Sequence, residues 1–145
     1  MSDRFQLQPI GRVEAGDDGF AIVVDEPYRD ALIGLEGFSH INVLMWFHLL
    51  DSPESRSVMV AERPYRDAPD RLGMFATRSP MRPNPIALTA VPVLSIEVEG
   101  GRITIPFIDA EAGTPVLDIK PYHLSLIHIS EPTRRATIAR MPSSA

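Results

Sequence analysis

Residues 73–89 spell GMFATRSPMRPNPIALT, and this stretch contains three prolines between two apolar runs. Each proline fixes its own φ, removes a backbone donor and pushes the preceding residue towards extended geometry. The segment is therefore incompatible with a helix or a central strand. We predict a stiff loop between strands at residues 72–77 and 86–99.

Two arginines give this loop its chemical interest. Arg78 and Arg82 lie four residues apart, and Asn84 follows between two prolines. Guanidinium groups on a rigid backbone suit carboxylate or phosphate recognition. The alternative is a pair of solvated surface arginines, because short motifs match by chance. The strand-like flanks and the constrained Arg-Pro-Asn-Pro run favour a ligand site.

Composition limits the classes of protein that remain. The chain has 145 residues, 44% of them hydrophobic, which suffices for one domain with a real core. Its net charge is -5, so an RNA partner requires a local patch rather than a basic field. The absence of cysteine excludes disulfides and thiolate chemistry. No apolar run has the length of a membrane span and the N-terminus lacks a signal-peptide core, so we expect a cytoplasmic chain.

Turn residues divide the remaining sequence into short segments. Alternating and β-branched runs predict several strands, and one short helix is expected at residues 27–35. A turn at Gly16-Asp17-Asp18-Gly19 predicts one hairpin, and a tight turn at Gly100-Gly101 predicts the clearest one. The expected fold is mainly β, a small closed or partly closed β-barrel of six to seven mostly antiparallel strands. The other expected strands cover residues 5–13, 20–24, 39–50, 57–61 and 103–108, and residues 115–122 follow a turn at 109–114.

The last segment differs from the rest of the chain. Residues 124–145 lack the capping and turn residues that mark the ends of helices and strands. The run HLSLIHISEPTRR resembles translated adapter sequence. We therefore predict a barrel domain at residues 1–123 and treat 124–145 as a non-native or disordered tail. A genuine strand at residues 124–129 is the alternative.

A second cluster of polar residues follows near the end of the expected domain. Asp118, Lys120 and Tyr122 alternate along an extended segment, so they share one face of a strand. The alternative is an edge strand that shows an ion pair to water. Asp109, close to a Gly-Thr-Pro turn, is a weaker candidate and is most simply a turn residue.

Two histidines complete the candidates. His40, Asn42, Trp46 and His48 are expected on one face of the strand at residues 39–50. Histidines in this setting are more often hydrogen-bonded core or interface residues than ligands. His40 and His48 are about 25 Å apart at strand rise, so they do not share a metal ion, and we predict no metal site.

Four motifs follow one another along the chain: LEGFSH at 35–40, GMFATRSP at 73–80, RPNPI at 82–86 and GTPVLDIKPY at 113–122. Together they resemble those of the TsaA-like (TrmO-type) family of S-adenosylmethionine-dependent tRNA methyltransferases. The resemblance implies a β-barrel homodimer with the cofactor near the subunit interface. It further implies N6-methylation of N6-threonylcarbamoyladenosine beside the anticodon, at position 37 of tRNA.

The resemblance also suggests roles for single residues. Asp118, Tyr122 and Arg82 are the expected catalytic residues, with Asp118 holding the cofactor or accepting the N6 proton. The expected cofactor contacts are Arg78, Ser79, Pro80, Asn84, Pro85, Ile86, Asp118, Lys120 and His40.

The sequence departs from the expected family pattern in three respects. Ala87 stands where the family usually has glycine, and residues 124–145 replace the segment after the Lys-Pro-Tyr motif. The additional C-terminal domain of longer family members, which is expected to help with tRNA, is also expected to be missing. Two other functions stay open at this stage: a non-catalytic S-adenosylmethionine-binding module, and a methyltransferase that acts on a small molecule.

Overall fold

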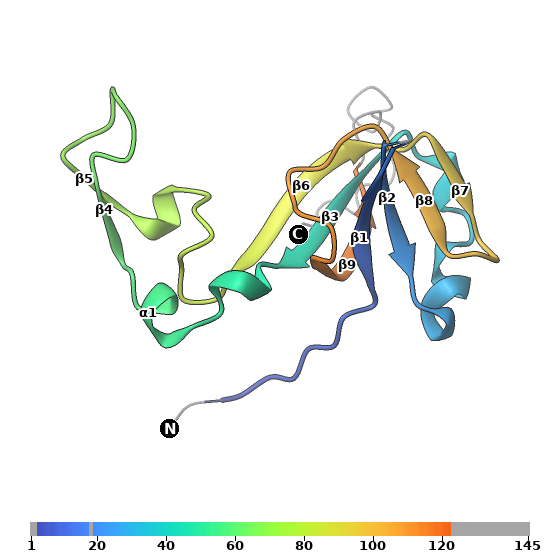
Figure 1. Ribbon diagram of the computed structural model, residues 1–145, viewed down its shortest axis with the longest axis horizontal. Helices are drawn as coiled ribbons and strands as arrows, with labels where there is room; N and C mark the ends of the chain where they lie inside the picture. The colour runs from blue at the N-terminus through green and yellow to red at the C-terminus, as the bar shows by residue number, and fades with distance from the viewer. Residues whose placement is uncertain (1–2, 18, 123–145) are drawn as a thin grey trace, which may run out of the picture.

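The computed structural model describes residues 3–17 and 19–122, and it is dominated by β structure (Figure 1). Seven strands form one antiparallel sheet in the order β6-β3-β9-β1-β2-β8-β7, and β4 and β5 form a separate hairpin. The strands are β1 (Gly11–Gly16), β2 (Gly19–Val24), β3 (His40–Trp46), β4 (Val60–Glu62), β5 (Arg71–Gly73), β6 (Ile86–Pro92), β7 (Ser95–Glu97), β8 (Arg102–Ile105) and β9 (Pro115–Pro121). The helical elements are the 3-10 turns η1 (Glu26–Leu32), η2 (Leu35–Gly37), η3 (His48–Leu50) and η4 (Met74–Ala76), and the short helix α1 (Pro53–Arg56).

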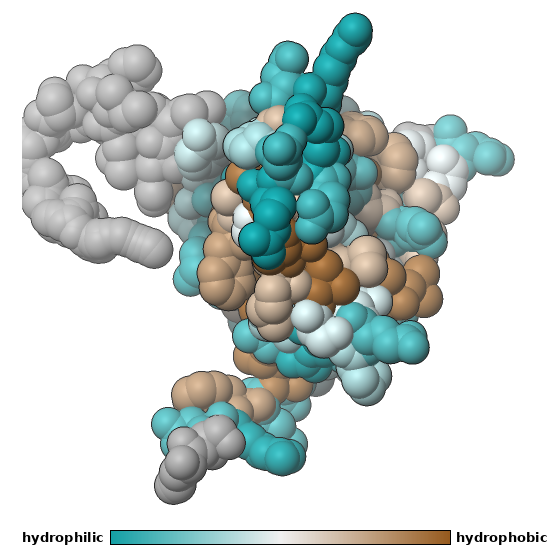
Figure 2. All heavy atoms as spheres, turned by 90° about the vertical axis from the view of Figure 1, so that its left-hand side faces the viewer, coloured by the Kyte–Doolittle hydropathy of each residue, from teal (hydrophilic) through white to brown (hydrophobic). Residues whose placement is uncertain are grey.

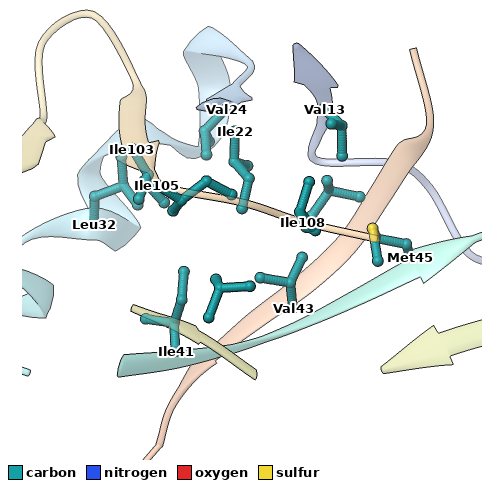
Figure 3. Packing of buried hydrophobic residues seen from close by; sticks show 12 residues of the cluster. Val13, Ile22, Val24, Leu32, Ile41, Val43, Met45, Ile103, Ile105 and Ile108 are labelled. Carbon is teal, nitrogen blue, oxygen red and sulfur yellow. The ribbon is translucent and has the colours of Figure 1, made fainter. Parts of the chain in front are cut away.

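The hydrophobic core lies inside the curl of the large sheet. In β3, buried side chains alternate with half-exposed ones, as the period of a strand requires. Figure 3 shows Ile41, Val43 and Met45 of β3 facing Ile22 of β2 and Ile103 of β8 across the core. The other side chains of β3 consequently point outward, and these carry the candidate site.

The predicted barrel is not confirmed, although the mainly β, antiparallel fold is. Within residues 3–17 and 19–122, β6 and β7 are the two edges of the sheet and do not pair with each other. Only Val93 and Leu94 separate these strands in the chain. Val93 N donates to Ser39 O (2.9 Å) and Leu94 N donates to Thr104 O (2.8 Å), so the chain crosses from one edge to the other there. The result is a curled, open sheet.

Two predicted hairpins are confirmed by the strand register. Val13 of β1 pairs with Ile22 of β2, and Ile96 of β7 pairs with Ile103 of β8. Gly101 in the second turn has φ +69°, and a Cβ there would lie 2.4 Å from Val24 O. Only glycine fits this position, because both the backbone conformation and the packing exclude a side chain.

Several predicted boundaries were wrong. The strand expected at residues 86–99 is two strands with a crossing between them, and the strand expected at 39–50 ends at Trp46. The helix expected at 27–35 forms as the 3-10 turn η1, and residues 5–10 are not a strand. Apolar composition alone does not reveal where a strand leaves its sheet.

The β4–β5 hairpin projects from the body of the molecule (Figure 1). Its three residue pairs join Val60–Glu62 to Arg71–Gly73, so the strands expected at 57–61 and 72–77 are confirmed in part.

The two alternatives for residues 124–145, a tail or a strand at 124–129, lie outside the described residues, and the domain boundary at 123 stays a prediction. None of the helices in the described part has the length and apolar character needed to cross a membrane.

The curled core yields the first testable expectation. Ile103 is fully buried, so Ile103→Ala should lower the free energy of unfolding by about 2–5 kcal/mol in urea denaturation. Ile33→Ala removes the same atoms from a side chain that is 70% exposed and should change stability by less than about 0.5 kcal/mol. Equal losses in the two variants would contradict the assigned core.

Candidate active site on the outer sheet face

Arg56, which ends α1, holds the proline-rich loop in place. Its Nε donates to Pro83 O (2.7 Å) and its Nη2 donates to Asn84 Oδ1 (2.8 Å). Nη1 pairs with Asp51 at 2.9 Å, and the guanidinium lies 5.6 Å from the centre of the Trp46 ring. Trp46 Nε1 in turn donates to Asp51 Oδ2 (3.2 Å). One side chain thus fixes both the loop and the indole.

Arg82 braces the same loop from within. Its Nη1 donates to Thr77 O (2.9 Å) and Ser79 O (3.1 Å), and its guanidinium lies 6.0 Å from the Phe75 ring centre. Ser79 contributes through its backbone N, which donates to Thr77 Oγ1 (3.1 Å). In this structure Arg82 shapes the loop, and its catalytic role stays a prediction.

The prolines of the loop differ in their surroundings. Pro85 is fully buried, and its carbonyl accepts from Phe47 N (2.8 Å), which anchors the loop where β6 begins. Pro80 is half-buried, and Ile86 is exposed at the start of β6. The loop therefore offers Pro80 and Ile86, rather than Pro85, to a bound molecule.

Arg78 reaches the free edge of the sheet. Its Nη1 donates to Leu88 O (3.0 Å), a carbonyl on the side of β6 where no strand follows in the described sheet. The other guanidinium nitrogens of Arg78 make no hydrogen bond to described residues. Arg78 thus carries spare donors beside the side chain of Leu88.

The second predicted cluster lies on the same outer face. Leu88, Leu44 and Asp118 form one row across β6, β3 and β9, and Asn42 pairs with Lys120 in the next row. Asp118 and Lys120 form an ion pair of 3.4 Å, which confirms that their side chains share a face. Both are about half exposed, so the pair contributes little stability and its charges are free to meet a ligand.

His40 extends this cluster by one more row. Its ring lies 6.3 Å from the ring of Tyr122, edge to face, and Tyr122 N donates to His40 O (3.0 Å). Ser39 Oγ lies 2.8 Å from His40 Nδ1. His40, Asp118, Lys120 and Tyr122 therefore occupy one continuous strip of the outer face.

Arg78 and Asp118 are not in contact within one chain. Leu88 and Asp118 stand on either side of β3, two strand spacings or about 10 Å apart. Leu88 is 46% exposed between them. An exposed apolar floor thus lies between a cation and a carboxylate.

His48 departs from its expected place. It lies in η3 beyond the end of β3, so it does not share the face of His40, Asn42 and Trp46. It lines a hollow of about 660 Å³ together with Arg78 and Asp109. This hollow is a second place where a ligand of Arg78 would find a carboxylate.

Two features of the site were missed from sequence. Arg56 was not predicted, because nothing local in a Ser-Pro-Glu-Ser-Arg turn shows that its side chain reaches residue 84. Leu88 was not predicted either, since an apolar residue in a strand normally indicates core.

Ala87 pairs with Met45 and packs against the core, so its methyl group points away from the outer face. Within the described ranges, no group of three or more His, Asp or Glu side chains is placed to hold a metal ion.

Comparison with known proteins adds independent information. The model of the tRNA-methyltransferase O N-terminal domain matches residues 6–126. A probable S-adenosyl-L-methionine-binding protein of Pyrococcus horikoshii is 38% identical over 81% of this chain and 82% of its own length. The human tRNA (adenine(37)-N6)-methyltransferase is 46% identical over 63% of this chain. The chain spans only 20% of that human protein.

Solved structures agree with the sequence comparison. A crystal structure of TrmO from Pseudomonas aeruginosa superposes with a TM-score of 0.65 and 28% identity, over 98% of this chain and 64% of that one. A second TrmO crystal structure gives 0.65 and 26%, over 93% and 65%. The chain thus spans slightly less than two thirds of these TrmO chains.

The Arg56 network predicts how the loop responds to its loss. Arg56→Ala removes three hydrogen bonds to residues 51, 83 and 84, so the loop should open and trypsin should cleave faster after Arg78. Limited proteolysis with mass spectrometry measures the rate. Arg102→Ala removes only an exposed pair with Glu14 and serves as the control. An unchanged rate after Arg78 in Arg56→Ala would refute the bracing role.

Proposed function

The chain belongs to the tRNA-methyltransferase O family, and from this premise we propose that it is an S-adenosylmethionine-dependent methyltransferase. Its substrate is the N6 atom of an adenosine in tRNA, specifically N6-threonylcarbamoyladenosine at position 37. The observation that carries this proposal is the row Leu88–Leu44–Asp118, with the spare donors of Arg78 at one end and the Asp118 carboxylate at the other.

The residues of this row fit the cofactor chemically. S-adenosylmethionine carries a carboxylate, an ammonium group, ribose hydroxyls and apolar surface, and when extended it is long enough to span two strand spacings. Arg78 offers a guanidinium fork to a carboxylate. Leu44 and Leu88 offer an apolar floor, and Asp118 offers an acceptor for an ammonium or hydroxyl group. When bound, the cofactor supplies an electrophilic methyl group on a sulfonium.

The chain's own residues have distinct tasks in the proposed reaction. A bound cofactor would supply the methyl group and leave as a neutral thioether, while N6 would gain a carbon–nitrogen bond and lose one proton. Asp118 is the carboxylate on this face that accepts the proton. Lys120 Nζ lies 3.4 Å from Asp118 Oδ2 and orients this carboxylate. Most of the acceleration comes from holding the reacting atoms in line.

A local basic segment supports an RNA substrate in spite of the acidic chain. Residues 56–82 hold six arginines against three carboxylates, a surplus of three positive charges in a chain of net charge -5. Within the described part, Arg78 and Arg82 form no salt bridge, so both remain available to phosphates or to the threonyl carboxylate. A chain with net negative charge needs a local basic patch to bind RNA, and residues 56–82 provide such a patch.

The proposal includes a homodimer with the cofactor near the subunit interface. Leu88 exposes an apolar side chain on β6, an edge strand whose outer side is unpaired in the described sheet. A second copy over Leu88 would cover this side chain and would exclude water from the row between Arg78 and Asp118.

A second function is favoured by one observation. The relatives that this chain covers for most of their length, from P. horikoshii and Methanocaldococcus jannaschii, carry the name probable S-adenosyl-L-methionine-binding protein. A module that binds the cofactor without transferring its methyl group would fit that name. Cofactor titration and methyl transfer to tRNA, measured on one preparation, separate the two: binding without transfer favours the module. A small-molecule methyltransferase would instead transfer the methyl group without RNA.

The cofactor proposal makes a quantitative prediction. Arg78→Ala and Asp118→Asn should each weaken S-adenosylmethionine binding at least about tenfold in calorimetry, because each removes a charge-assisted contact. Arg102→Ala, which removes an arginine far from the row in sequence and sheet order, should bind like the parent chain. Parent-like binding by both site variants would refute the assigned cofactor site.

The proposed dimer is tested separately. Leu88→Lys places a charge on the exposed row without entering the core, so the monomer should fold while dimerisation weakens. Sedimentation velocity should show a dimer for the parent chain and a monomer for the variant. A parent chain that stays monomeric at high micromolar concentration would contradict the dimer.

A further inference from the structure

A groove beside the proline loop has no role in the function described so far. It encloses about 960 Å³ between the extended N-terminal segment and the end of the sheet. Figure 1 shows this segment running away from β1 below the sheet, and Figure 2 shows how far it stands off the body. The lining side chains used below are Phe5, Trp46, Arg56, Asn84 and Ile86.

The groove contains a rigid aromatic platform. Trp46 is held by its Nε1–H bond to Asp51 and by the Arg56 guanidinium 5.6 Å from its ring centre. Phe5, on the opposite wall, is 87% exposed. Aromatic side chains and an arginine plane are the surfaces on which unpaired bases of single-stranded RNA stack.

The groove also contains donors of fixed direction. Asn84 Oδ1 accepts from Arg56 Nη2 (2.8 Å), which fixes the amide orientation. Asn84 Nδ2 donates to no acceptor among the described residues, so both of its hydrogens are available to a base edge.

The groove is adjacent to the arginine-lined side of the loop. Asn84 and Ile86 line both this groove and a hollow of about 610 Å³ that also contacts Arg78 and Arg82. A nucleotide with its base in the groove would thus have its phosphate or acyl group near two guanidinium groups. No comparable cation pair faces the apolar hollow beneath η1 and η2.

We propose that this groove binds an unpaired base of the RNA substrate, stacked at Trp46 and hydrogen-bonded by the Asn84 amide. The inference rests on the proposed tRNA substrate, since it names the part of that RNA which meets this surface. It assigns the end of the outer face at Trp46 and Ile86 to RNA and leaves the row Leu88–Leu44–Asp118 to the cofactor.

Trp46 is the sole tryptophan of the chain, which gives a direct readout that does not depend on turnover. A single-stranded RNA hexanucleotide titrated into the full chain should quench the tryptophan emission. The same sequence in a duplex should quench much less, because its bases are already stacked. Asn84→Asp keeps an acceptor for Arg56 but removes both amide donors, and should weaken hexanucleotide binding about tenfold.

A second variant tests stacking without risk to the fold. Phe5→Ala alters a side chain that is almost fully exposed and should weaken binding by a factor of about five or more. Leu49→Ala, an exposed apolar residue that does not line the groove, is the matched control and should bind normally.

Four outcomes would overturn the proposal. Two of them are equal quenching by duplex and single-stranded RNA, and parent-like RNA binding by both groove variants. Another is quenching that follows protein concentration without RNA, which would assign the groove to a second copy of the chain. The last is full competition by S-adenosylmethionine, which would assign the groove to the cofactor. Quenching without methyl transfer would instead refute the enzyme function while the groove stands, and transfer without quenching would refute the groove alone.

Discussion

The site depends on the contacts that Arg56 makes with the proline-rich loop. Prolines stiffen the loop but remove the backbone donors that would otherwise tie it to the sheet. Arg56, which lies outside the loop, compensates for the missing backbone hydrogen bonds because its side chain donates to Pro83 O, Asn84 Oδ1 and Asp51 Oδ1. Hydrogen bonds from a charged donor are stronger than neutral ones, and three from one side chain fix an orientation. Because these contacts hold the loop backbone, Arg78 is positioned so that its Nη1 donates to Leu88 O of β6.

The curl of the sheet determines what the loop then faces. Because β3 turns Ile41, Val43 and Met45 inward, its alternate residues lie outward beside β9 and β6. This arrangement puts Leu88 and Asp118, which belong to motifs about thirty positions apart in sequence, into one row of the same surface. Cation, apolar floor and carboxylate thus follow one another across three strands. An open edge at β6 leaves this surface accessible from the side.

Much of this architecture was predictable from local sequence, and the failures have physical causes. Alternation predicted that Asp118 and Lys120 share a face, and glycine turns predicted the hairpins, because both depend on neighbouring residues. Closure of a barrel depends on whether distant edges pair, which no local pattern reveals. His48 was misplaced because the strand was extended through Phe47, where the backbone instead turns into η3. The role of Arg56 depends on a contact 28 residues along the chain, which sequence spacing does not show.

A crystal structure with S-adenosylmethionine bound would test the assigned cofactor site directly. Ligand density should extend across Leu88 and Leu44, with Arg78 at one end of the ligand and Asp118 or Lys120 at the other. Density in the hollow lined by His48, Arg78 and Asp109, away from Asp118, would contradict it.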